Sequence, residues 1–283
     1  MWIPIISAIA LAAGTVAERF LLKKKKVNIK HFQTFSFLSI SIILLPLVFF
    51  FWNAKPEAFQ LKNILLMLAI VVISFFANIL TFYSLKKETL TKLEPIRITE
   101  PLFVILFSII FSLIGLTIFE TKTSILIPAL IAGVALVFAH IKKHHLQFSS
   151  ASLAALFGSL LFALELVLSR LVLDYYSAIT FYFVRCILIG ILTFIVFRPK
   201  LFQKGNSGLN LKIFLIAIIW IVYRIILYYG YLEIGVVSTT LMLMLGPILI
   251  YFSSVIFLKE KLNWKSIILS LIILGCVLYA SLI

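Results

Sequence analysis

The sequence predicts an all-α integral membrane protein with ten transmembrane helices in two inverted five-helix repeats. Three observations lead to this fold class: the apolar composition, the spacing of the apolar segments, and a similarity between the two halves of the chain. Of the 283 residues, 63% are hydrophobic and only 12% are charged. A soluble domain cannot bury so large an apolar fraction, so we expect lipid to surround most of the chain.

Apolar segments fill nearly the whole chain, and each is close to the length of about 20 residues that a helix needs to cross a bilayer. Short charged or turn-forming stretches separate them, which leaves no room for a soluble domain. The expected helices are residues 2–22, 31–52, 63–85, 92–118, 123–141, 149–171, 177–197, 211–232, 236–258 and 264–283.

Lysine and arginine are distributed unevenly between the two ends of these helices. One set of loops and its flanks carries 18 of the 25 basic residues, the other carries 4, and three arginines lie inside spans. Cytoplasmic loops are enriched in basic residues. We therefore predict a multi-pass protein of the cytoplasmic (plasma) membrane with both termini outside. The net charge of +15 is explained by this asymmetry, so we expect no nucleic-acid partner.

The two halves, residues 1–145 and 146–283, resemble each other when one is shifted by 146 or 147 residues. The aligned pairs include Glu18 with Glu165, Lys23 with Arg170, Tyr83 with Tyr229, and Pro101 with Pro247. A unit of five helices crosses the membrane an odd number of times, so the second copy enters from the opposite side. Inverted repeats are typical of secondary transporters, whose substrate site lies near the membrane midplane between the repeats.

Each half closes with an apolar helix that contains proline, a glutamate, and then an apolar helix that contains glycine. The residues are Pro101, Glu120 and Gly133 in the first half, and Pro247, Glu260 and Gly275 in the second. With ten helices in two halves, this pattern resembles the EamA-type transporters of the drug/metabolite transporter (DMT) superfamily, and Arg185 matches an arginine of that family. The resemblance implies two EamA-like repeats and carrier-mediated movement of small metabolites, often export, without ATP.

Seven charged side chains fall inside the expected spans: Glu18, Glu94, Arg97, Glu100, Glu165, Arg185 and Arg224. A charge at the centre of a spanning helix costs roughly 2.5–3.5 kcal/mol, so these residues should face the interior of the bundle. Glu94, Arg97 and Glu100 share one helix face. Arg224 lies near mid-membrane on a second face with aromatic neighbours, and its repeat mate is Asn78. Tyr182 and Arg185 share a third face.

These faces predict a central cavity lined by the third, fourth, seventh and eighth helices. Arg224 and Arg185 would hold the acidic group of a substrate, because guanidinium groups bind carboxylates and phosphates through two hydrogen bonds. Glu94, Arg97 and Glu100 would receive a basic group, and the aromatic side chains Trp220, Tyr223 and Tyr228 an apolar body. The predicted substrate is an amino acid, a related zwitterion or an organic anion, exported by alternating access.

Several alternatives stay open. The intramembrane charges could pair only with one another, with Glu18 and Glu165 contacting the bases five residues later, Lys23 and Arg170, or Arg19 in the case of Glu18. Glu18 and Glu165 could instead carry a proton or act in gating. Within the superfamily, the substrate could be a nucleotide sugar or a sugar phosphate. Outside it, a lipid- or sugar-modifying enzyme using Glu94, Glu100 or His31, or a structural subunit, would also explain intramembrane charges.

No catalytic motif or nucleotide-binding loop occurs, so we expect a carrier that is not an enzyme and that has no cofactor. His140, His144 and His145 lie in a basic loop without an acidic or cysteine partner, so we expect no metal site there. The expected partners are the small-molecule substrate and the lipid bilayer, with the chain acting as a monomer or a homodimer.

Overall fold

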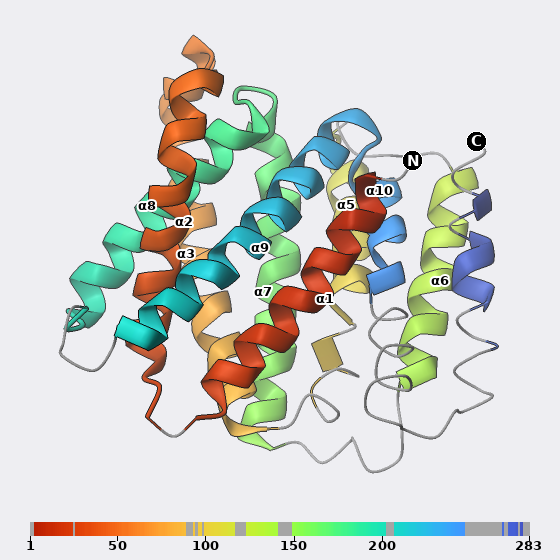
Figure 1. The fold of residues 1–283 in the computed structure, drawn as a ribbon. Coiled ribbons are helices and arrows are strands. Elements are labelled where there is room, and N and C mark those ends of the chain that lie inside the picture. The colour runs from red at the N-terminus through yellow and green to blue at the C-terminus, as the bar shows by residue number, and fades with distance from the viewer. Residues whose placement is uncertain are drawn as a thin grey trace.

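The computed structural model describes residues 3–24, 26–88, 93, 96–97, 99–116, 123–140, 149–201, 207–246, 268, 271–276 and 278–279. The described helices are α1 (Ile3–Leu22), α2 (Ile29–Phe51), the short 3-10 helix η1 (Pro56–Phe59), α3 (Leu61–Lys87), α5 (Thr99–Leu113), α6 (Thr123–His140), α7 (Ser150–Leu173), α8 (Ala178–Phe197), α9 (Ser207–Glu233) and α10 (Val236–Leu243). Figure 1 shows them packed as one helical bundle.

Most predicted helices appear close to their expected positions. Among the described residues, five helices are long and apolar enough to cross a membrane: α2, α3, α7, α8 and α9. The chain is therefore a multi-pass membrane protein. Of the last two predicted helices, the structure describes residues 236–246, 268, 271–276 and 278–279, and the remainder lies outside the described residues. A total of ten spans thus stays a prediction.

The fourth predicted helix, residues 92–118, ends earlier than expected. α5 stops at Leu113, followed by Gly115 at φ +91°. The Leu116 amide donates to the Phe111 carbonyl and the Gly115 amide to the Ser112 carbonyl, both at 3.0 Å. This is a Schellman motif, in which a left-handed residue lets the last helical carbonyls find donors, and glycine adopts that conformation without steric penalty.

The distribution of polar and apolar side chains is the reverse of that in a soluble protein. Glu165 and Arg185 are almost completely buried inside the bundle, at 0% and 2% exposure. Large apolar side chains such as Phe49, Phe50 and Leu113 are more than three-quarters exposed on its surface. An apolar surface around a charged interior is stable when lipid is the solvent.

Helix contacts between the two halves occur in matching pairs. α1 packs against α9 as α7 packs against α3, and α1 contacts α10 as α7 contacts α5. α2 contacts α9 as α8 contacts α3. Two further contacts, α2 with α8 and α5 with α10, join a helix of the first half to the equivalent helix of the second half. The shift of 146 or 147 residues relates the members of each pair, so this packing fits the two-repeat architecture.

Within the described residues, most lysines and arginines lie at one end of the bundle, which we call the basic end. There Lys86 donates to the Val27 carbonyl oxygen, and the Tyr83 hydroxyl lies 3.4 Å from that of Ser150. The Lys30 ammonium lies over the Phe197 ring, 5.7 Å from its centroid. These contacts join the loop after α1 to the end of α3, the end of α3 to the start of α7, and the start of α2 to the end of α8.

At the other end, which we call the opposite end, the loop after α2 pairs with the loop after α7. Ala54 and Tyr176 form an isolated antiparallel bridge. The Lys55 amide donates to the Tyr175 carbonyl and the Ser177 amide to the Asn53 carbonyl, each at 2.9 Å. The two halves of the chain are thus joined backbone to backbone at this end.

Candidate substrate pocket

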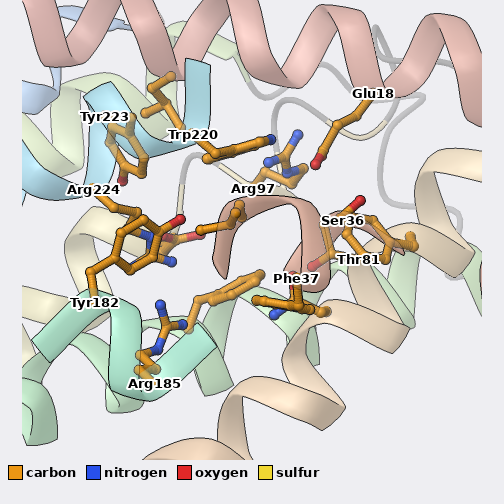
Figure 2. Close-up of a pocket in the computed structure, with 16 residues that line it drawn as sticks. Glu18, Ser36, Phe37, Thr81, Arg97, Tyr182, Arg185, Trp220, Tyr223 and Arg224 are labelled. Atoms are coloured by element: carbon orange, nitrogen blue, oxygen red, sulfur yellow. The ribbon is translucent and has the colours of Figure 1, made fainter. Parts of the chain in front are cut away.

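A pocket lies inside the bundle between the two halves, with about 670 Å³ of empty space that includes a part open to solvent. Its walls come from α1, α2, α3, α7, α8 and α9, with Glu100 from the first turn of α5 and Arg97 just before that helix (Figure 2). Most residues singled out from the sequence line it: Glu18, Asn78, Arg97, Glu100, Tyr182, Arg185, Trp220, Tyr223 and Arg224. Glu94 lies outside the described residues.

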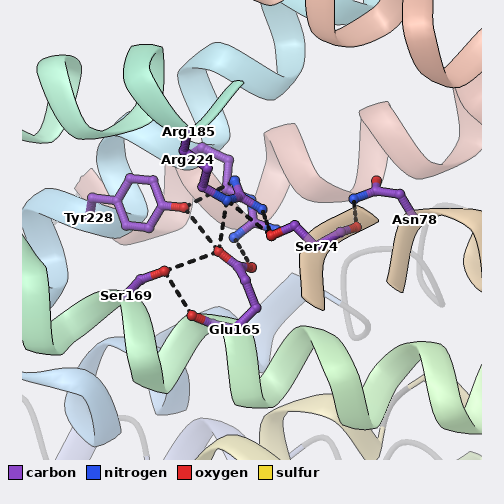
Figure 3. A network of polar contacts seen from close by, with 7 residues as sticks. All are labelled: Ser74, Asn78, Glu165, Ser169, Arg185, Arg224 and Tyr228. Atoms are coloured by element: carbon purple, nitrogen blue, oxygen red, sulfur yellow. Dashed lines mark hydrogen bonds and ion pairs between the residues drawn. The ribbon is translucent and has the colours of Figure 1, made fainter. Parts of the chain in front are cut away.

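Two lining residues, Arg185 and Arg224, belong to a charged network centred on Glu165 (Figure 3). Arg185 Nε lies 3.0 Å from Glu165 Oε1, and Arg224 Nη1 lies 3.3 Å from Glu165 Oε2. The three side chains come from α7, α8 and α9. One carboxylate therefore joins three helices, and both arginines predicted to bind substrate are already paired with it.

Neutral hydroxyl groups complete this network. Arg185 donates to Ser74 Oγ at 3.0 and 3.3 Å and to the Tyr228 hydroxyl at 3.2 Å. The Tyr228 hydroxyl lies 3.5 Å from Glu165, and Ser169 donates to Glu165 Oε1 at 3.1 Å. Ser74 brings α3 into the network, so four helices meet there. We call Glu165, Arg185, Arg224, Ser74, Ser169 and Tyr228 the central network.

Arg185 and Arg224 differ in what else surrounds them. Arg185 has contacts to Glu165, Ser74 and Tyr228, which hold its guanidinium group on several sides. Arg224 contacts Glu165 and lies over two aromatic rings, 5.5 Å from the centroid of Tyr223 and 5.8 Å from that of Phe162. Arg185 is thus the more firmly anchored of the two.

Glu165 does not pair with Arg170, contrary to one interpretation of the sequence. Arg170 Nη1 instead lies 2.7 Å from Asp174 Oδ1. The reason is helical geometry: residues four apart lie on one helix face, whereas a residue five positions on is rotated away by about 140°. The bases near Glu18 also have other contacts, since Arg19 donates to the Leu85 carbonyl oxygen and Lys23 lies over the Phe20 ring.

Toward the basic end, the pocket contains a second polar group formed by Glu18, Arg97, Trp220 and Ser36. Figure 2 shows the Arg97 guanidinium group between the Trp220 indole and the Glu18 carboxylate. Arg97 Nη1, Trp220 Nε1 and Ser36 Oγ are buried and have no hydrogen-bond partner. We call these four residues the outer group.

Sequence reasoning missed part of the wall. α1, α2 and α7 contribute to the pocket in addition to the predicted helices, through residues that include Ser36, Phe37 and Phe162. Single serines and phenylalanines carry no signal in so apolar a sequence. Ser169 could have been found, because it lies four residues after Glu165 on the same helix face. Tyr228, predicted to contact substrate, lies in the central network.

A family model of EamA-like transporters matches the chain twice, over residues 1–143 and 149–282. The chain belongs to the EamA-like transporter family. It is therefore a membrane transporter of the drug/metabolite type. No curated protein matches the chain. A crystal structure of another protein superimposes on 99% of this chain and 96% of its own with a TM-score of 0.66, at 16% sequence identity, which shows a shared fold.

Proposed function

We propose that this EamA-like transporter moves a small zwitterion, such as an amino acid, across the cytoplasmic membrane by alternating access. The observation that carries the proposal is the balance of charge around the pocket. In the described part of the chain there are three guanidinium groups, Arg97, Arg185 and Arg224, and three carboxylates, Glu18, Glu100 and Glu165.

A balanced set of buried charges favours a ligand with no net charge but with charged ends. A net charge brought into the bundle would be left without compensation, and desolvation makes this expensive. A zwitterion adds one positive and one negative group, and it keeps the balance. The aromatic side chains Phe37, Tyr182 and Tyr223 in the same wall suit the apolar part of such a molecule.

The pocket's position supports loading from the basic end, which we place in the cytoplasm. Glu18, Ser36 and Phe82 line the pocket and lie near the ends of α1, α2 and α3 that meet the basic loops. At the opposite end, the loops after α2 and α7 are joined by the backbone pairing around Ala54 and Tyr176. This arrangement suits a carrier that takes up substrate from the cytoplasm, and we propose export as its direction.

A nucleotide sugar or sugar phosphate is less well suited. Such substrates carry a net negative charge and would need an excess of positive groups. Glu165 pairs with the wall residues Arg185 and Arg224 and so neutralises part of their charge.

Counterflow tests the proposal. Proteoliposomes preloaded with one unlabelled amino acid are given the same amino acid in labelled form, over a panel of amino acids, organic anions and sugar phosphates. We expect rapid, saturable uptake of at least one amino acid relative to protein-free liposomes. Uptake confined to sugar phosphates or other anions would contradict the zwitterion proposal and assign the carrier to another substrate class.

A further inference from the structure

The two polar regions of the pocket differ in how well their hydrogen-bonding groups are satisfied. In the central network, the Arg185 and Arg224 guanidinium groups contact Glu165 within 3.3 Å. In the outer group, Arg97 Nη1, Trp220 Nε1 and Ser36 Oγ are buried without an acceptor. Buried polar groups are nearly always hydrogen-bonded, because an unpaired donor loses its hydration without replacement. Three unpaired groups beside one pocket indicate a ligand that supplies acceptors.

The outer group also contains a negatively charged side chain, Glu18, beside these donors. The Glu18 carboxylate points toward Arg97 and Trp220 (Figure 2). A positive donor and a carboxylate placed side by side complement a molecule whose ammonium and carboxylate are attached to the same carbon. Arg97 and Trp220 would donate to the carboxylate of that molecule, while Glu18 would accept from its ammonium group.

Comparison of the two repeats explains why Glu18 is available for this role. Its counterpart Glu165 is held by Arg185 and Arg224. At the shift of 146 residues, the counterparts of those arginines in the first half are Ser39 and Asn78. The first half thus keeps the carboxylate but lacks the two guanidinium groups. Asn78 donates to the Ser74 carbonyl oxygen at 2.7 Å, within its own helix.

We propose that the outer group is the subsite for the charged head of the substrate. Arg97, Trp220 and Ser36 bind the carboxylate and Glu18 binds the ammonium group. The central network is a structural tie between helices, and Arg224 is not the carboxylate site. This assignment rests on the proposed transport of a zwitterion. Trp220 and Arg224 are four residues apart on α9, about 6 Å along the axis, so the apolar body lies between the two regions.

Binding to leucine and two analogues tests the roles separately. Isoamylamine lacks the carboxylate of leucine, and isocaproate lacks its amine. For the purified protein we expect Glu18→Gln to weaken the binding of leucine and isoamylamine about tenfold or more, and to leave the binding of isocaproate unchanged. The reason is that only leucine and isoamylamine have the ammonium group that forms a charge-assisted hydrogen bond with Glu18. Arg97→Gln should weaken the binding of leucine and isocaproate but not that of isoamylamine.

The exposed residues Glu57 and Arg198 lie outside the pocket, so Glu57→Gln and Arg198→Gln serve as matched controls and should bind all three compounds like the wild type. Equal losses for all three compounds in the Glu18 and Arg97 variants would overturn the inference. The inference would also be overturned if Arg224→Gln selectively lost binding of isocaproate while Arg97→Gln did not. Failure of the wild type to bind any of the three would also overturn it.

A second measurement needs no ligand. Trp220 Nε1 has no hydrogen-bond partner, so Trp220→Phe should melt close to the wild-type temperature. Arg224→Gln should melt lower, because it breaks the contact with Glu165, and Trp52→Phe at an exposed position is the control for Trp220. Early melting of Trp220→Phe, as early as that of Arg224→Gln, would make Trp220 structural and overturn the inference.

The two proposals can fail separately. An amino acid that is transported with unchanged affinity by both Glu18→Gln and Arg97→Gln would leave the proposed function standing and overturn the subsite. Selective binding of isocaproate and isoamylamine through Arg97 and Glu18, without transport of any amino acid, would support the subsite and contradict zwitterion transport.

Discussion

Glu165 has no exposed surface, and its carboxylate contacts two guanidinium groups and two hydroxyl groups. Replacing a whole buried ion pair by apolar residues is often neutral, because desolvation offsets the attraction. Removing a single partner is different, since the remaining charges stay buried without compensation. Arg185 and Arg224 are therefore tolerable in the bundle only because Glu165 is present.

We predict that Glu165→Gln destabilises the protein by roughly 3–5 kcal/mol, the range for breaking a buried pair on one side. The measurement is thermal or denaturant unfolding in detergent. The control is Asp174→Asn, which breaks the partly exposed pair with Arg170. That pair is expected to contribute about 0–1 kcal/mol. Similar small effects of both substitutions would show that the central network is not a structural tie.

α3 and α7 approach each other closely where Gly158 faces Thr81. A Cβ atom at Gly158 would lie 2.8 Å from Thr81 Oγ1 and 3.4 Å from the Thr81 amide nitrogen. Thr81 also lines the pocket. Small residues at helix interfaces allow such close approach in membranes, where packing rather than the hydrophobic effect holds helices together.

We expect Gly158→Ala to separate α3 from α7 and to destabilise the protein by about 1–3 kcal/mol, as overpacking typically does. Thr81→Ala in the same chain should restore much of the stability, because it removes the clashing oxygen. Gly208→Ala, in the first turn of α9, is the matched control, since nothing lies within 4 Å of its added Cβ. Unfolding curves that coincide for Gly158→Ala and Gly208→Ala would contradict this account of the contact.

At the scale of the whole molecule, alternating access requires that the two ends open in turn. At the opposite end, the loops after α2 and α7, which belong to different halves, pair around Ala54 and Tyr176. If the halves rock against each other, this backbone pairing must break in every transport cycle.

A disulfide between Ala54→Cys and Tyr176→Cys should therefore block transport. Directly opposite residues of an antiparallel bridge have Cα atoms about 4.5–5.5 Å apart, which a disulfide can span. Counterflow should stop on oxidation and return on reduction, whereas each single-cysteine variant should be unaffected by oxidation. Full activity of the cross-linked protein would show that this end does not open during transport.

The orientation of the bundle in the membrane is a further prediction at this scale. The basic end carries most of the lysine and arginine residues, and we expect it to face the cytoplasm. In intact cells, a membrane-impermeant maleimide should label Lys55→Cys, at the opposite end, but should label Lys24→Cys only after permeabilisation. The reverse labelling pattern would show that both termini are inside.

Several features of this protein follow from its sequence alone. Apolar segments of spanning length predict the helices, because in lipid the backbone must satisfy its own hydrogen bonds. The shift that aligns Glu18 with Glu165 indicates the duplicated architecture, and the intramembrane charges indicate a polar interior. These inferences depend on local composition and on a regular spacing, which are visible without any contact between distant residues. The resemblance to the EamA-type transporters pointed to the family, and most of the residues singled out from the sequence line the pocket.

The partners of the buried charges were decided only by the tertiary structure. Glu165 is 59 residues from Arg224 along the chain, and the nearer base Arg170 pairs elsewhere. Helical periodicity shows which way a side chain points, but it does not show which helix lies opposite. The packing of α7 against α9, and of α1 near Arg97, determines which arginine is neutralised and which keeps an unpaired donor in the pocket. Long-range packing, which hydropathy does not encode, therefore separates the structural charges from those available to a substrate.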